Sequence, residues 1–115
     1  MSADRVTELL DEASENIAAA LHIHKSPAFP SGLSSRAGTF VELLGRLREV
    51  ATRLNDAILE APSTFNLGSD DDASAGNHIS EACARLSESI VDLASAHISA
   101  DEAHSALSHL KIHDV

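Results

Sequence analysis

The sequence has few of the residues that mark the commonest functional classes. It contains no Trp, no Tyr, three Phe, one Met and one Cys among 115 residues. A single cysteine, Cys83, excludes an intramolecular disulfide and gives no sign of an oxidising compartment. With so few aromatic residues, the core has to be built from Leu, Ile, Val and Ala. Such a core suits helices that pack closely through small side chains.

Basic residues are also scarce. Eight Lys and Arg stand against 18 Asp and Glu, which gives a formal net charge of −10 at pH 7. An acidic surface of this size repels phosphates, so we expect no direct binding of DNA or RNA and instead a protein partner, with a basic one favoured. The excess lies in the first 24 residues and after residue 70, because the middle of the chain is balanced. Its four arginines, Arg36, Arg46, Arg48 and Arg53, offset Glu42, Glu49, Asp56 and Glu60.

Long apolar runs are absent as well. No segment approaches the ~20 apolar residues that a membrane-spanning helix requires. The first residues are polar and acidic, without the basic region and apolar run of a secretory signal. We therefore expect no membrane segment and a cytoplasmic location.

What the sequence does contain is helical periodicity. Apolar residues between Phe40 and Ala61 recur at steps of three and four, which places them on one wide helical face and predicts a helix over 35–61. The same spacing predicts helices over about 3–24 and 78–98. One amphipathic helix cannot bury its apolar face alone, so the other segments must pack against it.

Prolines and capping residues set the expected boundaries. Pro27 and Pro30 end the first helix, and Pro62 ends the second. The stretch 62–77 lacks periodicity and carries three consecutive Asp, so it predicts a mobile acidic loop, with Phe65 and Leu67 packed back onto the core. The sequence Ser99-Ala100-Asp101-Glu102 has the form of a capping box, which predicts a break near Ile98 and Ser99.

These signals together predict an all-α fold in a single domain over 1–115. We expect a small antiparallel bundle of three long helices and a shorter C-terminal helix over 100–112.

Four apolar residues fall beside the main helical stripes and are candidates for a second interface. They are Val41, Leu59, Val91 and Ile98. Small helical hairpins often pair symmetrically to complete a core, so we expect a homodimer. Single exposed aliphatic residues are also common on monomers, which leaves the alternative open.

Seven His residues raise the possibility of a metal site near the C-terminus. His97, Asp101 and His104 would share a face of an unbroken helix, and His109 and His113 form a second pair four residues apart. Ordinary surface imidazoles explain the same pattern. A metal-binding helical protein is therefore the alternative interpretation, and we expect no cofactor.

Motifs for catalysis are missing. The sequence has no phosphate-binding loop and no Gly-x-Ser-x-Gly elbow, and Cys83 lies on an apolar stripe, where a core residue is expected. The acidic segment 70–81 resembles a calcium loop only in part, because Ala75 replaces the required glycine. The sequence thus predicts a non-enzymatic interaction module, an adaptor, inhibitor or small structural subunit that acts through an acidic helical surface.

Overall fold

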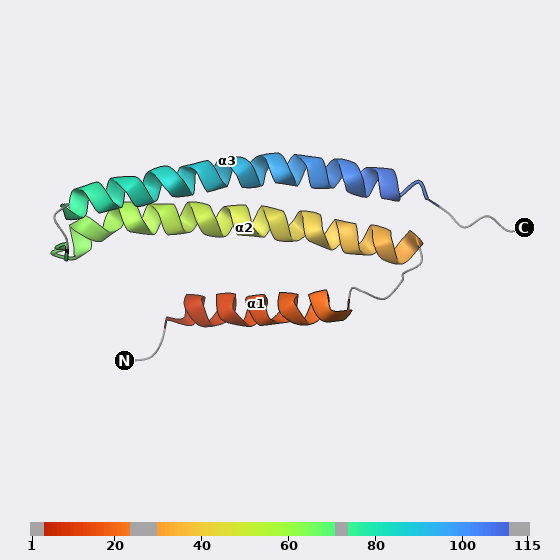
Figure 1. Cartoon of the computed structure of the whole chain (residues 1–115), viewed down its shortest axis with the longest axis horizontal. Coiled ribbons are helices and arrows are strands. Elements are labelled where there is room, and N and C mark those ends of the chain that lie inside the picture. Colours follow the sequence, from red (N-terminus) through yellow and green to blue (C-terminus); the bar gives the residue numbers. More distant parts are fainter. Residues whose placement is uncertain (1–3, 24–29, 71–73, 111–115) are drawn as a thin grey trace, which may run out of the picture.

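The protein is all-α, as predicted. The computed structural model describes residues 4–23, 30–70 and 74–110, and these ranges form three helices and no strand. Helix α1 spans Arg5–Ile23, α2 spans Pro30–Thr64 and α3 spans Ala75–Leu107. The three helices lie side by side, with α2 in the middle and antiparallel to both neighbours (Figure 1).

Helices α2 and α3 form the closely packed part of the molecule. Along α3, buried and half-buried residues recur at alternating steps of four and three over four heptads, a repeat typical of a coiled coil. The repeat consists of Ile79, Cys83, Leu86, Ile90, Leu93, His97, Ala100, His104 and Leu107, and three alanines beside it, Ala75, Ala82 and Ala94, are also half-buried. On α2 a matching seam, called the first seam below, contains Val41, Leu44, Ala51, Asn55 and Ile58. Leu44, Ala51 and Ala100 are the buried apolar residues of the described chain.

Two glycines of α2, one heptad apart, each lie against a histidine of α3. A β-carbon built on Gly38 would lie 3.2 Å from His104 Nε2, and one built on Gly45 would lie 3.6 Å from His97 Nε2. Both imidazoles are half-buried. Each glycine therefore leaves room for a histidine ring of α3, and this lets the two backbones approach closely.

The two glycines give a matched pair of stability predictions. Gly45→Ala should raise the free energy of unfolding by about 1 kcal/mol, because the methyl group fits at an ordinary contact distance and alanine is the better helix former. Gly38→Ala should gain less, because its methyl group has to displace the ring of His104. Urea unfolding followed by circular dichroism measures both. Equal gains would contradict the difference in fit.

The predicted break between the third and fourth helices is wrong. Helix α3 is continuous from Ala75 to Leu107, and a separate C-terminal helix is not shown. The physical reason is the uninterrupted heptad: Ala100 is buried, and His104 and Leu107 continue the face that packs on α2. Tertiary packing therefore overrides the local capping signal at Ser99, whose side chain is exposed. The expected end of the fourth helix, 111–112, lies outside the described residues.

Other predicted boundaries shift by a few residues. Helix α1 agrees with its prediction to within two residues, and Asp4 caps it through a hydrogen bond from the Val6 amide to Oδ1 (2.9 Å). Helix α2 begins five residues earlier than expected, at Pro30, which is a favourable first residue because proline has no amide hydrogen to satisfy. At its other end α2 continues past Pro62 to Thr64.

The loop after α2 is shorter than predicted and its apolar residues are not buried. Phe65 and Leu67 are exposed and do not pack onto the core. Ser74 ends the loop and caps α3, since its hydroxyl accepts a hydrogen bond from the Asn77 amide (3.1 Å).

Candidate interaction surface

Helix α2 carries a second apolar seam beside the one that α3 covers. This second seam also repeats at steps of three and four and consists of Phe40, Leu43, Leu47, Val50, Leu54, Ala57 and Ala61. It lies roughly 100° around the helix from the first seam, because Leu43 and Leu44 are consecutive residues. Phe40 is 54% exposed, Leu47 43% and Leu54 50%, whereas Leu44 of the first seam is only 7% exposed. Ala57 is exposed as well, whereas Leu43, Val50 and Ala61 are half-buried, so the second seam is covered only in part.

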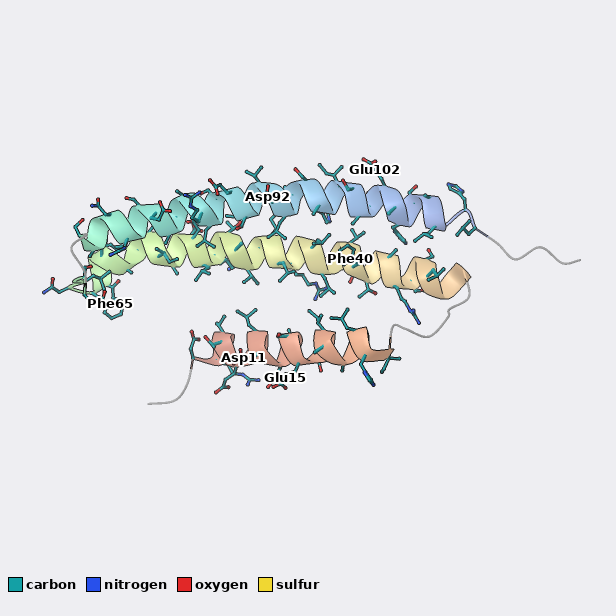
Figure 2. All side chains as sticks on the ribbon, in the orientation of Figure 1. Asp11, Glu15, Phe40, Phe65, Asp92 and Glu102 are labelled. Carbon is teal, nitrogen blue, oxygen red and sulfur yellow. The ribbon has the colours of Figure 1, made fainter. Side chains whose placement is uncertain are left out.

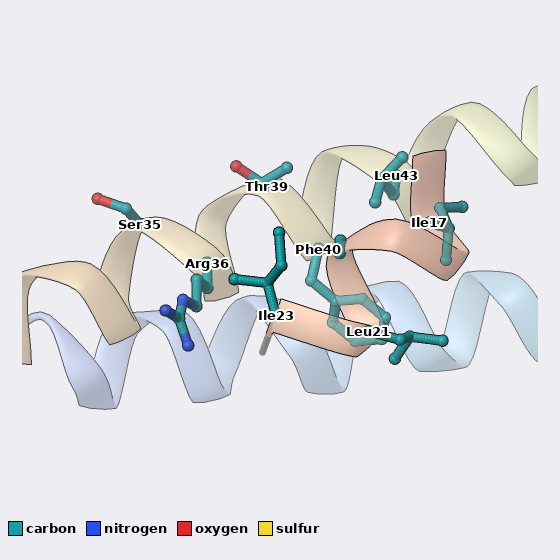
Figure 3. A pocket seen from close by; sticks show the side chains of 9 residues that line it. Ile17, Leu21, Ile23, Ser35, Arg36, Thr39, Phe40 and Leu43 are labelled. Carbon is teal, nitrogen blue, oxygen red and sulfur yellow. The ribbon is translucent and has the colours of Figure 1, made fainter. Parts of the chain in front are cut away.

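Helix α1 lies along the second seam without closing on it. No Cα atom of α1 comes within 8 Å of α2 or α3, whereas packed helices bring their axes to about 8–10 Å. A groove of about 560 Å³ separates the two helices. Leu21 of α1 and Phe40 of α2 face each other across it (Figure 3).

The facing side of α1 is itself apolar. Its stripe repeats at the same steps through Val6, Leu10, Ala13, Ile17 and Ala20. No residue of α1 is buried. Two apolar helical faces, one on α1 and one on α2, thus border the groove, and neither is buried by the other.

The surface area of the chain measures how much remains uncovered. The accessible surface is 9026 Å², against about 6,000 Å² for a compact monomer of 12.1 kDa. The unfolded chain would expose about 17,500 Å², so folding buries only about half of it, where a domain of this size ordinarily buries about two-thirds. The radius of gyration is 19.5 Å, against about 13 Å for a compact domain.

The acidic residues lie on the helices that flank α2. Helix α3 carries five carboxylates and one arginine, and α1 carries four carboxylates and one arginine. Glu15 lies on the side of α1 turned away from α2, and Glu102 on the side of α3 turned away from α2 (Figure 2). Of the carboxylates on these two helices, Glu15 and Glu102 thus lie on the outer faces of α1 and α3.

The arginine of α3, Arg85, pairs with two of the five carboxylates of this helix. Arg85 Nε donates to Glu81 (2.9 Å) and Nη1 to Glu88 (3.1 Å). These hydrogen bonds, with Glu81 contributing most, raise the pKa of Arg85 above its ordinary value. The positive charge of Arg85 is thus used in these two pairs. The other three carboxylates of α3, Asp92, Asp101 and Glu102, keep the rest of the helix negatively charged.

The charges of α2 are balanced within the helix. Arg46 lies 3.9 Å from Glu42, and Arg53 lies 3.1 Å from Glu49, each across one helical turn. All four side chains are exposed, so these pairs add little to stability. Their consequence is that α2 presents an apolar seam bordered by neutral pairs.

The interface candidates predicted from sequence occupy different places. Val41 is half-buried and follows the spacing of the first seam, which faces α3. Leu59 of α2 is exposed, and so are Val91 and Ile98 of α3. None of the four belongs to the second seam. The signal that could have found that seam was the width of the 40–61 stripe, which holds two heptad seams side by side.

The metal candidates are not brought together. His97 and His104 lie over two different glycines, two helical turns or about 10.5 Å apart along α3. Asp101 and His109 are exposed, and His113 lies outside the described residues. Within the described ranges, no three His, Cys, Asp or Glu side chains gather in a way that could hold a metal ion.

This placement predicts the response to zinc. Both imidazoles would have to leave the α2–α3 interface to bind one ion, so equimolar ZnCl₂ should not raise the melting temperature of protein purified without a His tag. Differential scanning fluorimetry tests this. A saturable rise that disappears in His97→Ala would contradict the assignment of these histidines to packing.

None of the described helices combines the length and the apolar character needed to cross a membrane. Searches against protein-family models, curated proteins and solved structures find no match to this chain.

Proposed function

We propose that the protein is a non-catalytic helical interaction module that docks to another protein through the apolar side of α1 and α2. The observation that carries this proposal is the exposed second seam of α2. A seam with heptad spacing over 22 residues, roughly 33 Å, is the kind of surface that a partner helix covers.

The acidic outer faces support a further part of the same proposal. They lie on α1 and α3, away from the second seam, so docking on the seam leaves them accessible. Opposite charge accelerates and selects the encounter with a basic protein more than it adds affinity. The module therefore has an apolar docking side, and acidic sides that favour basic partners, as in an adaptor or small structural subunit.

Site-specific photo-crosslinking in cells of the source tests the docking side. A benzoylphenylalanine at position 54, in the second seam, should give protein adducts, because that position should be covered by the partner. The same group at Ser95, an exposed position of α3, is the control and should give few. Absence of adducts from position 54 at equal expression would refute the proposal.

The adducts also identify what covers the seam. An adduct of twice the mass of the chain indicates a second copy, and any other mass indicates a different protein. Leu47→Asp in the same chain should abolish the adduct while the helical circular dichroism signal remains, because a carboxylate would then be buried against the partner.

A further inference from the structure

We infer that the occupant of the second seam is a second copy of this chain, with the two α2 helices packed antiparallel around a two-fold axis near Val50. This inference rests on the proposed function, since it names the partner of the same surface. Three observations carry it: the area left uncovered, the order of large and small residues along the seam, and the distribution of charge.

The uncovered area matches what a stable homodimer needs. The chain exposes about 3,000 Å² more than a compact monomer of its mass. Obligate homodimers bury about 2,000–5,000 Å² in total, so each copy supplies about 1,000–2,500 Å². The excess is larger than the area that one copy supplies to an interface of this class.

The order of side-chain sizes favours antiparallel pairing with an identical seam. Phe40, Leu43 and Leu47 make the first half of the seam bulky, whereas Ala57 and Ala61 make the last part small. A copy running in the opposite direction places Phe40 against the small residues and Leu47 against Leu54. Parallel pairing would set Phe40 against Phe40 and leave a gap between alanines, which packing at the density of a protein core does not permit.

The charges allow a like copy to approach on this side only. Each chain carries −10, and α1 and α3 together hold nine carboxylates against two arginines, so two copies repel each other along these helices. Beside the second seam, Arg46 and Arg53 are paired with Glu42 and Glu49 of the same helix. A basic partner would be drawn to the acidic faces, whereas the neutral, apolar seam is where identical chains meet without charge repulsion.

Sedimentation equilibrium of the purified chain tests the inference directly. The wild-type protein should be a dimer at micromolar concentration. Leu47→Asp or Leu54→Asp should raise the dissociation constant at least about 30-fold, the loss expected for a central interface residue. Leu59→Asp is the matched control, since it places the same charge on an exposed leucine of α2 outside the second seam, and it should dissociate like wild type.

Salt separates this dimer from binding of a basic partner. Screening weakens repulsion between copies that each carry −10, so raising NaCl from about 50 mM to about 500 mM should tighten self-association. Attraction between an acidic face and a basic partner would weaken under the same change. Weaker self-association at high salt would overturn the seam as the contact.

A cysteine placed on the axis tests the register. In a Cys83→Ser background, Val50→Cys should form an intermolecular disulfide under mild oxidation, because antiparallel pairing brings the two residues 50 together. Leu43→Cys, in the same seam, should remain reduced, because antiparallel pairing sets the two residues 43 about 21 Å apart, whereas parallel pairing would bring them together. Equal rates of oxidation would overturn the antiparallel register.

The outcomes also separate this inference from the function on which it rests. If the wild-type protein is still a monomer at about 100 μM, roughly 100-fold above the micromolar range tested first, the homodimer is overturned. The proposed function survives that result if position 54 still crosslinks to a different protein in cells. A monomer without adducts overturns both. Helical circular dichroism of every variant distinguishes lost association from lost folding.

Discussion

The structure depends on the fact that α2 carries two apolar seams while only one helix packs closely on it. The first seam is covered by α3, and this contact supplies the buried residues Leu44, Ala51 and Ala100. The second seam, about 100° away, keeps Phe40, Leu47 and Leu54 largely exposed. Burial of apolar surface is the main favourable term in folding, so a helix with two seams reaches its lowest free energy only with two close neighbours.

Specific residues fix how α2 and α3 align within the covered seam. Gly38 and Gly45 accept His104 and His97, and a slip by one turn would place the rings against larger side chains. Asn55 adds a polar element, since its buried Oδ1 has no hydrogen-bond partner within the described chain. A polar residue in a heptad seam typically lowers stability and selects one register. Asn55 thus favours one alignment of α2 with α3 while it lowers the stability of their contact.

The sequence was sufficient to predict the all-α class, the three long helices and the balanced charge of α2. Those features follow from local periodicity and residue type. The continuity of α3 could not be predicted, because the capping signal at Ser99 is local, whereas the burial of Ala100 depends on α2, about 50 residues away in the sequence. The division of the 40–61 stripe into two seams was equally hidden, since only the position of α3 shows which apolar residues are covered.

The position of α1 is also related to the second seam. The groove is lined by Ile17, Ala20 and Leu21 of α1 and by Phe40 and Leu43 of α2. These side chains are apolar on both helices, so α1 is a chemically suitable neighbour for this end of the seam. However, α1 has 19 residues, fewer than the roughly 22 residues of the seam, so α1 alone does not cover its whole length. The proposed dimer would bury apolar residues of α2 along the rest of this seam.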